Sequence, residues 1–246
     1  KHLNKNPSIN TFSAIKTNRK AHWFTSLGVG SQFPNLSSNM RVSNGLGEGT
    51  SSNDDIYSVS NNSQVILTAA VGRRWQHDSI WFPAHSIAVL YQHFFATNVG
   101  NLVMQYSSPL FANYRYNWNI SSNSLFAAAK LNIFQYDNLS PYINGGVGGA
   151  FLNASQYTET AMPGVSSSRV SPGFGENSTS QFAYNVGAGV DFQYTPSIII
   201  SFGYSYQNFG KVTSGNGAQA WSGQSLNLSA YRSNDVVAGM TYLFGK

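Results

Sequence analysis

The chain has 246 residues, of which 9% are charged and 14% are aromatic, and its formal net charge is +5. Soluble domains carry roughly 25% charged residues. The low charge therefore indicates either disorder or burial in lipid, and the 16 Phe and 14 Tyr argue against disorder. No run reaches the roughly 18 consecutive apolar residues of a membrane-spanning helix, which argues against a helical membrane protein. Because Cys is absent, disulfides and the common zinc–thiolate sites are excluded.

The basic residues gather at the start of the chain. Residues 1–20 contain five Lys and Arg residues, and the first acidic residue is Glu48. The other nine basic residues equal the nine acidic residues in number, so the net charge resides in this arm. The arm has no apolar core of signal-peptide length, which indicates a mature chain or one not secreted by that route. We predict a solvated basic arm, with contact to anionic headgroups or to a partner as the alternative.

From residue 22 onward, apolar residues alternate with small or polar residues at a period of two. In chain order, the alternating segments lie at about 23–30, 65–75, 85–95, 125–133, 143–151, 181–194, 198–207 and 236–244. Strict alternation over such lengths predicts strands that lie between two different environments.

The segment at residues 181–194 shows what these two environments are. One face carries Phe182, Tyr184 and Val186 and continues with apolar residues, whereas the other consists mainly of Gly, Ala, Asn and Gln. A soluble sandwich also alternates, but its solvent face is usually richer in Lys, Glu and Thr. Small residues suit the interior of a narrow closed barrel, and an apolar face that ends in aromatics suits lipid. Backbone groups in hydrocarbon must all be paired, so we predict an all-β, transmembrane, antiparallel up-and-down barrel over residues 21–246.

The segments between the strands alternate in length. Long segments rich in Ser, Asn and Gly lie near 34–62, 153–180 and 210–233; short turns lie at 136–141 and 195–197, with a slightly longer one near 76–83. Long loops on one side of the membrane and short turns on the other are typical of outer-membrane barrels. We therefore expect a bacterial outer-membrane protein with long extracellular loops.

The number of strands depends on the interpretation of residues 98–119. Residues 110–119 alternate well and make a ninth candidate strand, whereas bacterial barrels of this kind have even numbers of strands. Eight strands result if 110–119 and 124–134 form one long strand that pairs with an extension of 85–106 beyond the membrane. Ten strands result if 98–106 is a strand of its own, but this segment alternates poorly, so we favour eight.

The last predicted strand carries a pattern with a known counterpart. Gly239, Tyr242 and Phe244 match the C-terminal assembly signal of bacterial outer-membrane barrels, in which a Gly precedes two alternating hydrophobic or aromatic positions. Val237 stands where that signal has a polar residue, and Gly245 and Lys246 follow the terminal aromatic residue.

Two segments further upstream, SPYINGGVG at 140–148 and YNVGAGVDFQY at 184–194, are similar to strand-start phrases of opacity-protein and OmpX-type barrels. The chain thus resembles the small bacterial outer-membrane β-barrel proteins that include these two types and the OmpA transmembrane domain. This resemblance implies eight strands, contact with outer-membrane lipid and lipopolysaccharide, and insertion by the barrel-assembly machinery. Adhesion, host contact and membrane integrity all occur in this group, so the resemblance implies no role residue by residue.

The residue patterns that suggest chemistry are each incomplete. His77-Asp78-Ser79 has a His and a Ser two residues apart, as in outer-membrane lipid A deacylases, but it falls in a predicted periplasmic turn. No Glu is placed to orient this His. An omptin-like protease would need Asp-x-His, which does not occur, and His85 and His93 are too far apart on one strand to share a metal. We predict no catalytic residue, no metal, no cofactor and no nucleic-acid partner.

Three charged residues fall on the predicted lumen face: Arg74, Lys130 and Asp191. Ionised groups in a narrow lumen need partners, so we expect Asp191 to pair with Arg74 or Lys130. Eight strands leave little open bore, which favours a charge plug that closes the lumen over an ion path.

The long loops contain single apolar residues among their polar ones. Ile56, Tyr57, Met162, Phe174 and Trp221 are candidate contact points for a host or envelope protein, and the alternative is that they pack on one another over the barrel mouth. The sequence therefore favours a non-enzymatic surface barrel whose loops mediate contact, adhesion or envelope integrity. A lipid A-modifying enzyme and a narrow porin channel are the alternatives.

Overall fold

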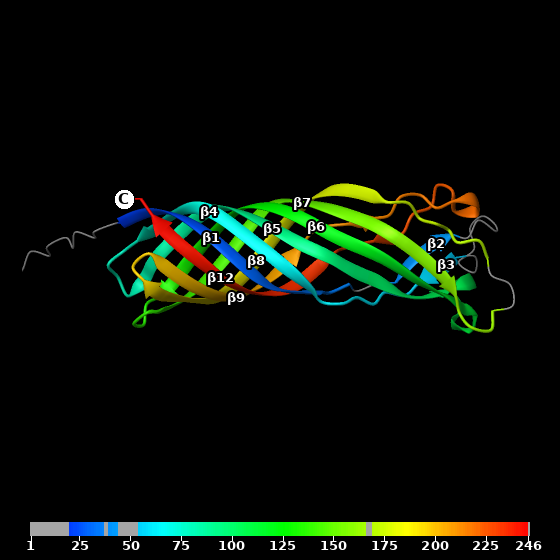
Figure 1. The fold of residues 1–246 in the computed structure, drawn as a ribbon, viewed down its shortest axis with the longest axis horizontal. Coiled ribbons are helices and arrows are strands. Elements are labelled where there is room, and N and C mark those ends of the chain that lie inside the picture. The colour runs from blue at the N-terminus through cyan, green and yellow to red at the C-terminus, as the bar shows by residue number, and fades with distance from the viewer. Residues whose placement is uncertain (1–19, 37–38, 44–53, 166–168, 246) are drawn as a thin grey trace, which may run out of the picture.

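A computed structural model describes residues 20–36, 39–43, 54–165 and 169–245. Most of the predicted basic arm lies outside these residues. Within them, eight long antiparallel strands form the wall of a barrel: β1 (Lys20–Pro34), β4 (Gln64–Gln76), β5 (Trp81–Met104), β6 (Ala112–Phe134), β7 (Leu139–Ala161), β8 (Asn177–Thr195), β9 (Ile198–Asn208) and β12 (Arg232–Phe244). Each strand pairs with its neighbours along the chain, and β1 pairs with β12 to close the ring (Figure 1).

The two ends of the barrel differ. At one end, tight turns join β4 to β5, β6 to β7, and β8 to β9. The other end carries small extra elements: β2 (Met40–Ser43), β3 (Asp54–Tyr57), β10 (Val212–Thr213), β11 (Asn227–Leu228) and the 3-10 turns η2 (Gln105–Ser107), η3 (Pro109–Phe111) and η4 (Gln219–Trp221). The β2–β3 hairpin extends the sheet through pairing of β3 with β5. By the loop pattern, this second end is extracellular and the first is periplasmic.

The structure confirms eight strands and excludes ten. Residues 98–104 continue β5, and residues 112–119 belong to β6, because these two strands pair from Trp81 and Phe134 to Met104 and Ala112 with three register shifts. The extracellular loops are also shorter than predicted, since β7 continues to Ala161 and β8 begins at Asn177. Polar outward-facing residues hide these strand extensions in the sequence.

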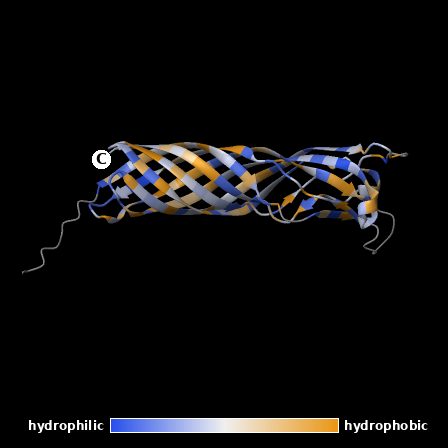
Figure 2. Cartoon of the chain, turned by 90° about the horizontal axis from the view of Figure 1, so that it is seen from below, coloured by the Kyte–Doolittle hydropathy of each residue, from blue (hydrophilic) through white to orange (hydrophobic). Residues whose placement is uncertain are grey.

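The outer wall of the periplasmic part of the barrel is an apolar belt (Figure 2). Exposed apolar side chains from all eight strands form it, among them Leu27, Val71, Val89, Leu125, Val147, Val186, Phe202 and Met240. Aromatic side chains line its two margins, with Trp23, Trp81 and Tyr194 at the periplasmic side and Tyr91, Phe182 and Tyr204 toward the extracellular side. An apolar band bounded by aromatic girdles is the lipid-facing surface of a membrane barrel. None of the described helices is long and apolar enough to cross a membrane.

Strand β6 shows that the barrel interior changes along its length. Even-numbered residues point inward from Tyr114 to Asn132, and they change from Lys130 and Asn132 near the periplasm to Trp118 and Tyr116 at the extracellular end, both fully buried. The outward-facing residues change in the opposite direction, from apolar Leu125 and its periplasmic neighbours to polar residues above it. The barrel therefore has a membrane half with a polar interior and an extracellular half with an apolar core.

The core of the extracellular half is large and aromatic. Its buried members come from the barrel wall and from the loops: Met40, Val42, Tyr57, Phe94, Val99, Val103, Tyr114, Tyr116, Trp118, Ile120, Leu152, Phe174, Phe209, Val212, Trp221, Leu226, Leu228 and Tyr231. The rings meet edge to face, as between Tyr57 and Tyr116, whose centroids lie 5.1 Å apart. This packing ties the extracellular loops to the barrel wall.

Candidate functional site

The three lumen charges predicted from the sequence lie together in the membrane half. Lys130 Nζ donates to Asp191 Oδ1 at 2.5 Å, and Arg74 NH1 lies 3.7 Å from Asp191 Oδ2. Asn132 Nδ2 donates to Asp191 Oδ2 at 3.0 Å, and Ser201 Oγ donates to Asp191 Oδ1 at 2.7 Å. Asp191 is 3% exposed, so this set of donors replaces the water that the carboxylate loses.

Tyr142 holds Lys130 from the other side. The Lys130 ammonium lies 3.8 Å from the centroid of the Tyr142 ring, a cation–π contact. The ring itself lies across Gly189 of β8 and Gly203 of β9, since a Cβ atom built on either glycine would come within 2.5 Å of the Tyr142 hydroxyl. Glycine suits these two positions because the Tyr142 side chain of β7 occupies the space that a Cβ atom would need.

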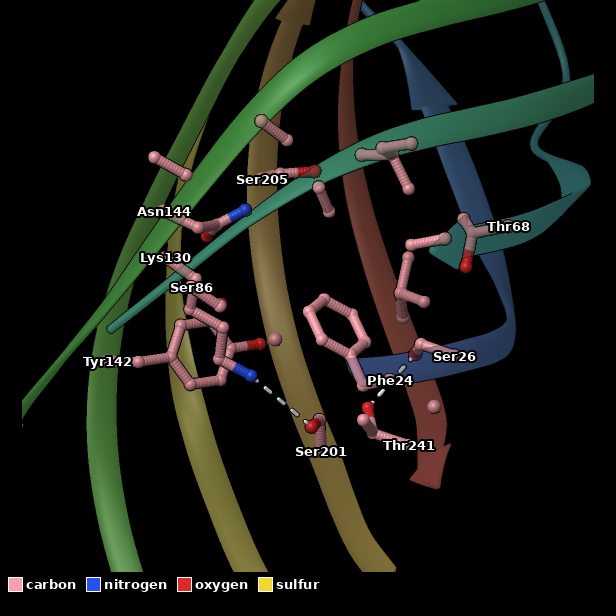
Figure 3. Close-up of a pocket in the computed structure, with 18 of the residues that line it drawn as sticks. Phe24, Ser26, Thr68, Ser86, Lys130, Tyr142, Asn144, Ser201, Ser205 and Thr241 are labelled. Carbon is pink, nitrogen blue, oxygen red and sulfur yellow. Dashed lines mark hydrogen bonds between the residues drawn. The ribbon is translucent and has the colours of Figure 1, made fainter. Parts of the chain in front are cut away.

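A cavity of about 180 Å³ adjoins the charge network, of which Lys130 and Ser201 form part of the cavity wall (Figure 3). Its wall carries many hydroxyl groups and the two lumen cations: Ser26, Thr68, Arg74, Ser86, Lys130, Ser201, Ser205 and Thr241. These hydroxyl groups and cations suit ordered water molecules. At the periplasmic side, Phe24, Ile199 and Leu243 form a small buried apolar cluster. The cavity thus lies between this apolar cluster and the aromatic core of the extracellular half.

The extracellular mouth contains a second charged site, which the sequence did not reveal. Arg169, in the loop between β7 and β8, donates from Nε to Glu159 Oε1 at 2.9 Å and from NH2 to Glu159 Oε2 at 3.2 Å. Its NH1 forms an ion pair with Asp55 of β3. The guanidinium carbon lies 4.7 Å from the Tyr114 ring centroid and 4.9 Å from that of Trp221. The one signal in the sequence is that Arg169 is the single basic residue between 153 and 180.

Burial and nearby charges shift the pKa values of Tyr57 and Arg169 in this second site. Burial raises the pKa of the Tyr57 phenol, and the negative charge of Glu159 raises it further. Burial acts to lower the pKa of Arg169, but the hydrogen bonds and charge of Glu159, with Tyr57 and Asp55, raise this pKa by more. The guanidinium is therefore charged and the phenol is neutral.

The predicted loop contact points do not behave alike. Tyr57, Phe174 and Trp221 are at most 7% exposed, because they pack in the aromatic core. This burial fits the alternative in which these side chains pack over the barrel mouth, and contact of the three residues with a partner stays a prediction. Ile56 and Met162 are partly buried, which leaves part of each side chain accessible.

The His77-Asp78-Ser79 turn does not form a nucleophile–base pair. His77 Nε2 lies 3.3 Å from His85 Nδ1, and the Ser79 hydroxyl donates to the Trp81 carbonyl at 2.7 Å. Among the described residues, no group of three His, Cys, Asp or Glu side chains could hold a metal ion. Of the predicted assembly signal, Tyr242 and Phe244 face outward at the periplasmic margin, where their rings stack with centroids 6.3 Å apart, whereas Gly239 lines the lumen cavity.

No family model matches the chain, and no curated protein matches its sequence. Solved structures with a similar arrangement include outer membrane protein OprG from Pseudomonas aeruginosa, at 14% identity and a TM-score of 0.46, covering 92% of this chain and 96% of that one. Neisserial surface protein A (NspA) has 15% identity and a TM-score of 0.45, covering 92% and 99%. Outer membrane protein AlkL has 13% identity and a TM-score of 0.39, covering 99% and 98%.

The geometry of the chain itself defines its class. A closed ring of eight antiparallel strands, an apolar outer belt between aromatic girdles, tight turns at one end and long loops at the other make it an outer-membrane β-barrel protein of the small, eight-stranded type. Its location is the outer membrane of a Gram-negative bacterium.

Proposed function

We propose that this protein is a non-enzymatic, non-conducting barrel that presents a rigid surface for contact outside the cell. The observation that carries the proposal is the aromatic core, which fills the interior of the extracellular half. Loops that are packed into such a core keep one shape, and a preformed surface binds a partner at a lower entropic cost than mobile loops do.

The interior argues against conduction. Tyr116, Trp118 and Phe94 are fully buried across the extracellular half, so the path from outside meets packed rings. Toward the periplasm, the Asp191 network and the cluster around Phe24 place further side chains in the lumen, and Arg74 lies between the lumen cavity and a second one at the periplasmic end. Eight-stranded barrels have interiors just wide enough for side chains, which fits a closed lumen.

The outer face of the extracellular half argues for contact. On β6 the outward positions from Arg115 to Asn123 are mainly Asn and Ser, whereas those from Leu125 downward are apolar. At about 3.3 Å per residue and a tilt of about 40°, this polar stretch raises the loops by roughly 20–25 Å above the lipid-facing belt. That height suits contact with an envelope or host protein beyond the headgroups, or with lipopolysaccharide.

Two measurements test this proposal. The purified barrel should show no conductance steps in planar lipid bilayers, whereas Trp118→Ala together with Tyr116→Ala should produce them if the rings form the block. Cells that display the parent barrel should attach to epithelial monolayers better than cells that display a barrel whose residues 162–176 are replaced by a tight turn. Steps in the parent, or equal attachment by the trimmed barrel when both reach the surface in equal amounts, would contradict the proposal.

A further inference from the structure

The guanidinium of Arg169 lies in a cage built by four separate elements. Strand β3 supplies Asp55, β6 supplies Tyr114, β7 supplies Glu159, and η4 supplies Trp221. Two carboxylates receive the N–H groups in the plane of the guanidinium, and two aromatic rings lie within cation–π distance of it. The walls of this cage are held by the core and the β-sheet, whereas its occupant comes from a loop.

The cage carries more negative charge than its occupant neutralises. Asp55 is fully buried and Glu159 has a side chain that is 1% exposed, so two buried carboxylates face one cation. In the part of the chain that the structure describes, Asp55 Oδ1 has no hydrogen-bond partner. Burying an uncompensated carboxylate is costly. Titratable groups that are buried beside a specific charged partner cluster at functional sites.

We propose that this cage is a binding site for an arginine side chain of a basic peptide or protein, and that Arg169 occupies it as an internal ligand that the partner's arginine replaces. This inference rests on the proposed contact function, because it names the chemistry of the partner at the extracellular mouth. The exchange swaps one guanidinium for another, so the hydrogen bonds, ion pairs and ring contacts that the guanidinium makes are the same before and after it, and only the hydrogen bond from the Arg169 backbone N–H to the Tyr114 hydroxyl is lost.

The geometry selects arginine over lysine. Glu159 receives Nε and NH2 through its two oxygens, while Asp55 receives NH1 on another edge of the same plane. Only a planar, forked cation can satisfy both carboxylates at once and still present a face to Tyr114. An ammonium group is a point charge that lacks this fork.

Arg169 competes with any external ligand because it is tethered beside the cage. A short flexible tether gives an effective concentration of the order of millimolar. A free guanidinium compound should therefore bind to the parent only at higher concentrations, whereas removal of the Arg169 side chain should lower the half-saturating concentration by about tenfold or more. A peptide with several arginines gains further contacts and competes better.

The first experiment empties the cage. Arg169→Ala barrels in detergent are titrated with agmatine, which carries a guanidinium, and with cadaverine as the ammonium control, while thermal unfolding of the extracellular half is followed by tryptophan fluorescence. Agmatine should raise the unfolding temperature at concentrations at least tenfold below those needed by the parent, and cadaverine should not. Adding Glu159→Gln to the variant should abolish the effect. Equal responses to the two amines, or a response that survives Glu159→Gln, would overturn the proposal.

The second experiment uses the parent protein, so it tests the proposal even if Arg169→Ala does not fold. Trypsin must take the Arg169 side chain into its own pocket to cleave before Val170, so a caged Arg169 is protected. Lys211 is exposed and serves as the internal reference for cleavage. An oligo-D-arginine, which trypsin does not cut, should raise the ratio of cleavage at Arg169 to that at Lys211 severalfold, and an oligo-D-lysine of equal length should not.

An unchanged cleavage ratio would refute exchange at the cage. The contact function is assessed separately by the attachment assay. Cells that attach normally while their barrels show no exchange would overturn only the cage proposal, whereas exchange without attachment would overturn the contact function and leave the cage as an isolated site. Arg115→Gln, a change on the outward face of β6, is the matched control for a general loss of positive charge.

Discussion

The membrane half and the extracellular half of the barrel are built from the same strands, but the apolar face of these strands points outward in the first and inward in the second. In the membrane half, apolar side chains point outward and the interior contains Asp191, Lys130 and hydroxyl groups. In the extracellular half, the interior is aromatic and the outward positions are polar. Because β5, β6 and β7 run through both halves without a break, the change occurs within single strands.

The difference shows that the solvent, and not the fold, decides which face of a strand is apolar. In water, burying a large apolar side chain contributes about 1.5–3 kcal/mol, so the extracellular half gains stability from its core as a soluble domain does. In lipid, apolar side chains can remain outside, and the interior can hold polar groups if these satisfy one another. Four sets of substitutions test this comparison.

The largest effect is expected in the aromatic core. Trp118→Ala removes a fully buried indole from the extracellular half and should cost about 3–5 kcal/mol of its stability through lost packing and a residual cavity. The neighbouring Asn117 points outward, so Asn117→Ala should change the stability by less than about 0.5 kcal/mol. Limited proteolysis of the extracellular half in liposomes measures both. Equal protease resistance of the two variants would mean that the core does not hold this half together.

A second test places the same cation on the same face of β6 in each half. Ala127 faces outward in the apolar belt and Asn117 faces outward above it. Ala127→Arg should cost about 2–4 kcal/mol of folding free energy in bilayers, whereas Asn117→Arg should be nearly neutral because its side chain stays in water. Refolding into liposomes under urea gives both values. The division into two halves fails if Asn117→Arg is as damaging as Ala127→Arg.

A third test concerns the polar interior of the membrane half. Asp191→Ala leaves Lys130 and Arg74 without their carboxylate, which costs roughly 3–5 kcal/mol when the site is dry. Because the Lys130 side chain is 23% exposed and the cavity adjoins it, we expect water to reduce this cost to about 2 kcal/mol. Asp191→Asn retains the shape of the side chain but not its charge. Its unfolding temperature should lie between those of Asp191→Ala and the parent in heat-resistance assays on detergent-solubilised barrels. Parent-like resistance of Asp191→Ala would show that the network contributes nothing.

The smallest effect is expected where Tyr142 crosses the glycines. A Cβ atom at position 203 would lie 2.3 Å from the Tyr142 hydroxyl, and its next contact is at 3.4 Å. Gly203→Ala should therefore cost about 1–3 kcal/mol by overpacking, and most of this cost should disappear in a Tyr142→Phe background. A double-mutant cycle in urea measures the coupling. Additive costs would show that the hydroxyl does not fill the space over the glycine.

The membrane half was largely predictable because lipid imposes a strict period of two on its strands. The period-two pattern of β6 also contains the change from the extracellular half to the membrane half. Its apolar positions are even-numbered from Tyr114 to Ile120 and odd-numbered from Leu125 to Ile133. The sequence alone joined these segments into one strand but did not say which face lies inside. The lumen residues Arg74, Lys130 and Asp191 could be placed on one face by strand parity.

The extracellular site could not be predicted in this way. Arg169 and Asp55 are 114 positions apart, and both lie in segments predicted as loops, where no periodicity fixes the direction of a side chain. Their meeting depends on how the β2–β3 hairpin docks on β5 and how η4 packs on the core. Burial of Tyr57 and Trp221 follows from the same docking, and for that reason the sequence did not show it.

Closure of the ring by β1 and β12 has a consequence for the time course of folding. The hydrogen bond from Thr241 to Ser26 joins residues 215 positions apart. Every other neighbouring pair of wall strands follows one another along the chain. Contacts between residues so distant in the chain form slowly, because the ends must first find each other. Until β12 is in place between them, β1 and β9 each present a row of unpaired backbone groups to which a second chain can add. A chain that stalls before β12 is complete should therefore aggregate through these two edges, and the nascent barrel must be shielded there until its last strand arrives.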